Sequence, residues 1–135
     1  MRTLYVNMNR KSKESLDTAQ LLLDKKRFTQ SVHCAYYAVL QFMSYKLTTT
    51  INPISYNEQN YSIHRQGNSH EYLFDEIKKR LLSINPKIAK DFQEDFRDLK
   101  ANRVEADYSQ RQFNDEEGCD CKAQAERLIN KLNRI

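Results

Sequence analysis

The sequence has few residues that break helices, since only two glycines and two prolines occur among 135 residues. Two glycines cannot supply the glycine-rich loops that bind phosphates in Rossmann and P-loop proteins, nor the many tight turns of an all-β sandwich or barrel. Cysteine is also scarce: Cys34, Cys119 and Cys121 are odd in number and lack the spacing of a disulfide framework or a zinc site. The sequence therefore favours an all-α fold, and we expect neither a metal nor a cofactor.

Long apolar runs are missing too. The longest, residues 34–40, is far shorter than a membrane span, and residues 1–7 lack the apolar core of a signal peptide. Together with the unpaired cysteines, this predicts a cytoplasmic protein without membrane contact. The net charge of +4 is too small to indicate a nucleic-acid partner by itself.

The chain does contain regularly spaced apolar and aromatic residues, including eight tyrosines and six phenylalanines. Its length suits one domain spanning residues 1–135. Five segments carry apolar residues every three or four positions, the spacing of a helix with one buried face. They cover residues 9–26, residues 28–47, a segment from Ser69 to the break before Pro86, a segment that Pro86 opens, and a segment capped near Asn114.

Between the second and third of these segments, residues 48–68 show no sustained period and contain Pro53 and Gly67, which predicts a long loop. The pattern as a whole predicts an all-α bundle of four to five, mostly antiparallel, helices. The modest apolar content and many aromatic residues also suggest a partner or a dimer.

Arg103 interrupts the apolar stripe of the fourth segment, which runs through Phe92, Phe96 and Leu99. A buried guanidinium needs a carboxylate or a polar cleft, because an unpaired buried charge is costly. Such a group can bind phosphate oxygens through two parallel hydrogen bonds. Asp107, one turn later, could orient it, and Tyr108 would place a hydroxyl near the same rim. The alternative is that Arg103 lies on a solvated edge.

His70 is in phase with Leu73 and Phe74, so it is expected to point inward at the start of its helix. It is a candidate acid or base, although a lone histidine there is more often a core or cap residue. Ser69 beside it is most simply an N-cap. His64 is interpreted as a surface residue, and His33 lies beside the apolar stripe of its segment.

The run Ala-Tyr-Tyr-Ala-Val-Leu-Gln at residues 35–41 resembles the second helix of the prokaryotic HEPN domains, the higher eukaryote and prokaryote nucleotide-binding helical bundles. Two further elements resemble the matching segments of a small single-domain branch of this family. They are the Ser-His pair at residues 69 and 70 and the element Arg-x-x-Ala-Asp-Tyr at residues 103–108. The likeness extends over about residues 15–132.

This resemblance implies a HEPN-like bundle that forms a homodimer with its arginine helices close together. Many HEPN proteins are metal-independent endoribonucleases, often toxins encoded beside a nucleotidyltransferase antitoxin. Their motif is an arginine followed after four to six residues by a histidine. Here Tyr108, Ser109 and Gln110 stand where that histidine would be, which puts nuclease activity in doubt.

Three functions follow from these observations. The first is a nucleotide-, RNA- or partner-binding module of a toxin–antitoxin or defence system, with Arg103, Asp107 and Ser69 binding the ligand. The second is an atypical endoribonuclease in which Arg103, Tyr108 and His70 are catalytic. The third is a structural helical dimer in which Arg103 pairs with an acid. Modification of Tyr108 by a partner enzyme is a further alternative within the first.

Overall fold

A computed structural model describes residues 6–135, so most of the segment 1–7, where we expect no signal-peptide core, lies outside the described residues. Over the described range the chain forms six helices and no strand, which confirms the all-α fold. In chain order they are α1 (Met8–Asp24), α2 (Phe28–Thr49), α3 (Tyr56–Gln66), α4 (Ser69–Ile84), α5 (Pro86–Tyr108) and α6 (Asp115–Leu132). No helix in this range has both the length and the apolar character needed to cross a membrane.

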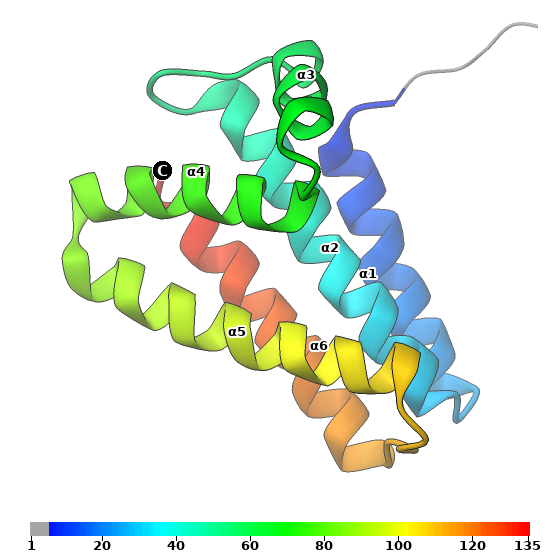
Figure 1. The fold of residues 1–135 in the computed structure, drawn as a ribbon. Coiled ribbons are helices and arrows are strands. Elements are labelled where there is room, and N and C mark those ends of the chain that lie inside the picture. The colour runs from blue at the N-terminus through cyan, green and yellow to red at the C-terminus, as the bar shows by residue number, and fades with distance from the viewer. Residues whose placement is uncertain (1–5) are drawn as a thin grey trace, which may run out of the picture.

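Helix α2 is the centre of the bundle and contacts each of the other five helices (Figure 1). Its buried residues recur at helical spacing over its whole length, as the sequence predicts. Those with no exposed surface are Val32, Ala35, Tyr36, Ala38, Val39, Met43 and Leu47. Helix α2 packs most extensively against α1, α6 and α5, so it is covered on several sides.

Helices α4 and α5 form a tight hairpin with a single residue, Asn85, between them (Figure 1). The Asn85 backbone N–H donates to Leu81 O, and its side chain accepts from the Lys87 N–H at 2.9 Å. Pro86 is then the first residue of α5, a position where its missing N–H costs nothing. The hairpin brings the first turn of α4 beside the second half of α5, and this placement builds the site.

The expectation of a loop at residues 48–68 is wrong, because this segment contains α3. Ser55 caps the helix by accepting a hydrogen bond from the Glu58 N–H, and Gly67 ends it with a φ of 77°. The buried residue of α3 is a glutamine, whereas its apolar Ile63 is only partly buried against the core. Gln59 is 2% exposed and bonds to Ser44 and to the Ile54 carbonyl. A helix anchored by a polar side chain has no apolar stripe for periodicity to detect.

The remaining helix ends agree with the sequence apart from two details. Asn68, not Ser69, is the N-cap of α4, since the Asn68 side chain accepts from the Glu71 N–H at 3.1 Å. Asn114 and Glu117 form the expected capping box of α6. Ile135 lies beyond the end of α6 but still packs against the core.

Candidate functional site

Arg103 lies on the buried face of α5, as its phase in the sequence predicts. It shares this face with Ala89, Phe92, Phe96 and Leu99, and its side chain is only 8% exposed. The solvated-edge alternative for Arg103 is therefore wrong. A charge this deeply buried must be compensated by its surroundings.

The compensation of Arg103 is incomplete. Its Nη1 donates to Asp107 Oδ2 at 3.4 Å, a long contact, and its Nε is buried without an acceptor among residues 6–135. The guanidinium carbon lies 4.8 Å from the ring centroid of Tyr36 and 5.8 Å from that of Tyr37. Cation–π contact with two tyrosines holds the charge without using its N–H donors.

Asp107 links Arg103 to a residue that the sequence did not single out. Its carboxylate lies 2.8 Å and 3.0 Å from Nδ1 of His33, across the boundary between α5 and α2. The His33 side chain is 47% exposed, whereas that of Asp107 is 19% exposed. Asp107 thus divides its charge between two partners, which explains why it leaves Arg103 short of acceptors.

His70 reaches the same place from α4. Its Nδ1 lies 2.8 Å from the Tyr36 hydroxyl. Burial raises the pKa of Tyr36 well above its usual value of 10.0, so the hydroxyl stays protonated. Burial, with the positive charges of Arg103 and Lys100, lowers the pKa of His70 below its usual 6.5. His70 is accordingly a neutral imidazole at pH 7.

Tyr37 completes the arrangement, because both histidine rings pack against it. The centroid distances are 4.6 Å to His33 and 5.8 Å to His70. We call the whole group the Arg103 cluster; its members are His33, Tyr36, Tyr37, His70, Arg103 and Asp107.

Three of the residues expected at the site, Arg103, Asp107 and His70, are brought together in the cluster. The other two expected residues lie outside the cluster. Tyr108 is 79% exposed at the end of α5, and Ser69 is the first residue of α4. Arg103 donates its hydrogen bond to Asp107, not to Tyr108 or Ser69. Sequence reasoning missed the roles of His33, Tyr36 and Tyr37. Their partners in the cluster lie mainly on other helices, although both tyrosines belong to the run that resembles the HEPN domains.

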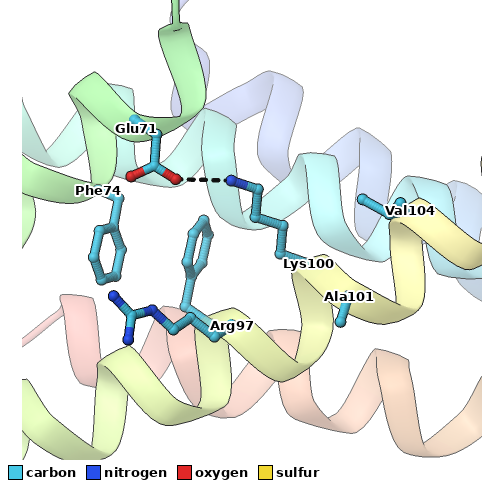
Figure 2. Close-up of a pocket in the computed structure, with 7 residues that line it drawn as sticks. Glu71, Phe74, Arg97, Lys100, Ala101 and Val104 are labelled. Atoms are coloured by element: carbon cyan, nitrogen blue, oxygen red, sulfur yellow. Dashed lines mark hydrogen bonds and ion pairs between the residues drawn. The ribbon is translucent and has the colours of Figure 1, made fainter.

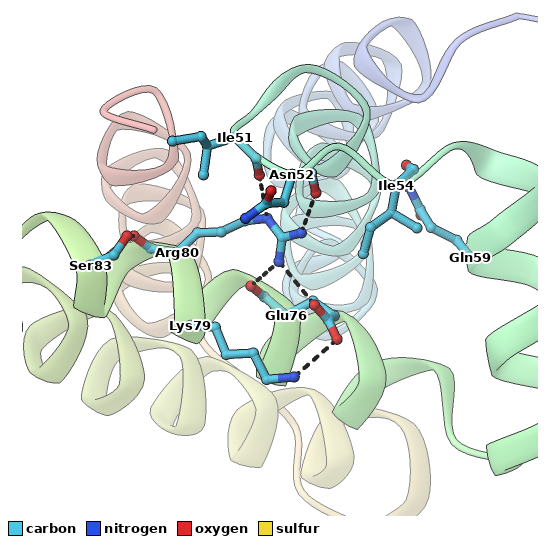
Figure 3. A network of polar contacts seen from close by, with 8 residues as sticks. All are labelled: Ile51, Asn52, Ile54, Gln59, Glu76, Lys79, Arg80 and Ser83. Atoms are coloured by element: carbon cyan, nitrogen blue, oxygen red, sulfur yellow. Dashed lines mark hydrogen bonds and ion pairs between the residues drawn. The ribbon is translucent and has the colours of Figure 1, made fainter.

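Arg80, the other arginine that is buried among the described residues, has hydrogen-bond acceptors for its guanidinium within the protein. Arg80, with 9% of its side chain exposed, donates to the carbonyls of Ile51, Asn52 and Glu76 and to the Glu76 carboxylate (Figure 3). Its Nε, Nη1 and Nη2 all have acceptors, and they fix the segment between α2 and α3. Arg103 is buried to the same degree with a single acceptor.

Two surface hollows flank the cluster. One, of about 300 Å³, is lined by Thr29, His33 and Asp107 together with other residues of α1, α2 and α5. The second, of about 400 Å³, lies between α4 and α5, and its lining is shown in Figure 2. Within residues 6–135 no group of three or more histidine, cysteine or acidic side chains is placed to hold a metal ion. No protein-family model, curated protein or solved structure matches this chain.

Proposed function

We propose that this chain is a HEPN-like module that binds single-stranded RNA, with a backbone phosphate held by Arg103. The observation that carries the proposal is the buried Nε of Arg103 without an acceptor, beside one long bond to Asp107. Buried donors are almost always paired in folded proteins, so an unpaired one calls for an explanation such as a bound ion, a water molecule or a catalytic role. A phosphate oxygen is the acceptor that best matches a guanidinium.

The surroundings of Arg103 favour an anion rather than another protein side chain. The rings of Tyr36 and Tyr37 fix the guanidinium plane, so little side-chain entropy is lost on binding. His33 shares the Asp107 carboxylate, which reduces the repulsion that this carboxylate would exert on a phosphate. The resemblance of the sequence to the HEPN domains favours RNA as the source of the phosphate, a homodimer as the active form, and a nucleotidyltransferase as partner.

The alternative of a purely structural dimer also expects Arg103 to pair with an acid, and Asp107 is such a partner. That alternative does not explain why Nε lacks an acceptor when Arg80 has one for every nitrogen. It further expects that removing Arg103 changes stability without changing RNA affinity.

A binding titration separates these two functions. Fluorescence anisotropy with a labelled single-stranded RNA should show that Arg103→Met weakens binding by about tenfold or more, the effect of losing a charge-assisted hydrogen bond. Arg10→Met is the matched control, because it removes the same charge from an exposed site on α1. Equal affinities of the wild type and Arg103→Met would overturn the proposal.

Mass measurement after co-expression with a neighbouring nucleotidyltransferase tests the partner and any modification of Tyr108.

RNA cleavage is a second candidate, favoured by one observation: a neutral histidine lies beside the arginine. If Nδ1–H of His70 donates to the Tyr36 oxygen, Nε2 keeps a lone pair for a proton. In the step we propose, Nε2 takes the proton of a 2′-hydroxyl, O2′ bonds to phosphorus, and the bond from phosphorus to O5′ breaks. Arg103 holds the phosphate oxygens, and the departing O5′ takes a proton from solvent water.

Cleavage is tested by incubating the pure protein with RNA in EDTA and identifying the new ends. This candidate expects 2′,3′-cyclic phosphates from the wild type and their loss in His70→Ala, with His64→Ala on the exposed face of α3 as control. Intact RNA after long incubation with the wild type rejects cleavage and leaves the binding proposal standing.

A further inference from the structure

The groove between α4 and α5 adjoins the Arg103 cluster and has its own chemistry (Figure 2). Its lining residues are Glu71, Phe74, Phe96, Arg97, Lys100, Ala101 and Val104. The volume of about 400 Å³ falls within the usual range of small-molecule sites, roughly 300 to 1,000 Å³.

The groove and the cluster share a wall. Phe96 lines the groove, and its ring centroid lies 5.7 Å from the ring centroid of Tyr36. Glu71 follows His70 directly in the chain, and Val104 follows Arg103. The groove and the Arg103 cluster are therefore neighbours on α4 and α5.

The floor of the groove suits a flat, partly apolar group. Val104 lines the groove with an apolar side chain that is 42% exposed. The guanidinium carbon of Arg97 lies 6.0 Å from the centroid of the Phe74 ring, so a planar cation covers an aromatic floor (Figure 2). Nucleobases in single strands stack on aromatic rings and on guanidinium planes.

The rim of the groove carries one acceptor next to two positive charges. Lys100 Nζ bonds to Oε1 of Glu71 at 2.9 Å, and this bond lowers the pKa of the Glu71 carboxyl group. Glu71 is therefore ionised at neutral pH and has acceptor capacity but no donor. A carboxylate in this state accepts from an exocyclic amino group, such as N4 of cytosine, and has nothing to offer O4 of uracil.

We infer that this groove receives one base of the RNA strand whose phosphate Arg103 holds, and that Glu71 favours a base with an exocyclic amino group. The inference rests on the proposed function and gives it a substrate class. The charges of Arg97 and Lys100 complement the strand's backbone, while the flat guanidinium face of Arg97 and the apolar side chain of Val104 complement the base. A second copy of this chain is the main competing occupant.

The experiment compares three labelled oligonucleotides of equal length: oligocytidylate, oligouridylate and an abasic strand that carries only backbone. The wild type is expected to bind them in that order, with cytidylate roughly tenfold tighter than uridylate. Glu71→Gln should bring these two affinities together, because an amide offers a donor as well as an acceptor. Ala101→Leu, which fills the groove without changing charge, should weaken binding of both base-containing strands about tenfold but not that of the abasic strand.

Thr18→Leu, on the exposed face of α1, is the control for adding an exposed leucine. The inference is overturned if the abasic strand binds the wild type as well as oligocytidylate, or if Ala101→Leu binds every strand like the wild type. It is also overturned if Ala101→Leu dissociates a dimer in analytical ultracentrifugation, since a second copy then covers the groove. In these cases loss of binding in Arg103→Met still supports the proposed function, whereas a wild type that binds no strand rejects both.

Discussion

The guanidinium of Arg103 lies over the ring of Tyr36, with 4.8 Å between the guanidinium carbon and the ring centroid. The same tyrosine contacts His70 through its hydroxyl at 2.8 Å. One buried side chain of α2 therefore positions a cation from α5 with its face and an imidazole from α4 with its edge. Substitution can separate the contact of the Tyr36 ring with Arg103 from the hydrogen bond of the Tyr36 hydroxyl to His70.

Tyr36→Phe should keep the cation–π contact and remove the bond to His70. We expect RNA affinity close to that of the wild type, a loss of about 1 kcal/mol in the free energy of unfolding, and loss of any RNA cleavage. Tyr36→Leu should weaken RNA binding as well, because the guanidinium loses its support. If Tyr36→Phe lowers RNA affinity as strongly as Tyr36→Leu, the ring face is not what positions Arg103.

The two buried arginines should respond differently to replacement by methionine. Arg80→Met leaves the carbonyls of Ile51 and Asn52 without their side-chain donor and removes one of the two cations that contact the Glu76 carboxylate, so the free energy of unfolding should fall by about 3 kcal/mol. Arg103→Met removes a poorly compensated charge and its unpartnered Nε, and Asp107 keeps His33. Its stability should stay within about 1 kcal/mol of the wild type or rise. Chemical denaturation measures both, and an equal loss in the two variants would contradict this contrast.

The depressed pKa of His70 should make the protein less stable in mild acid. As the pH falls through 6.5, the unfolded chain takes up a proton at this residue before the folded protein does. The free energy of unfolding should therefore decrease between about pH 7.5 and pH 5.5. His70→Asn should flatten this dependence, whereas His64→Asn should keep it. A wild-type slope in His70→Asn would show that His70 is not the group responsible.

Helix α3 should depend on a single polar anchor. Gln59→Ala removes the bonds to Ser44 and Ile54 and leaves buried acceptors unpaired, which should cost about 2 kcal/mol or more. Hydrogen exchange should then quicken in α3 before the rest of the bundle. Asn60→Ala, at an exposed position of the same helix, is the control. Unchanged protection of α3 in Gln59→Ala would mean that other contacts hold it.

Much of the fold follows from apolar periodicity. The spacing of Phe92, Phe96 and Leu99 predicts both the helix and the inward position of Arg103, and Asn114 with Glu117 predicts the start of α6. Periodicity failed at α3, where the inward residue is Gln59 and no apolar stripe exists.

The sequence predicts only those contacts of the site that lie within a single helix. Asp107 lies one turn after Arg103, so their contact follows from helix geometry. The contacts of His33 with Asp107 and of Tyr36 with His70 join different helices, and they depend on how those helices pack. The resemblance to HEPN domains, and the RNA ligand it implies, stay predictions.

The most direct measurement of the central claim follows the Nε–H of Arg103 by nitrogen-15 NMR while single-stranded RNA is added. The signal is assigned by its absence in Arg103→Met. If this group gains a phosphate acceptor, its resonance should shift on binding and its exchange with water should slow, at RNA concentrations that match the anisotropy titration. If RNA binds and the Arg103 signal keeps its position and its exchange rate, the phosphate is held elsewhere and the account is wrong.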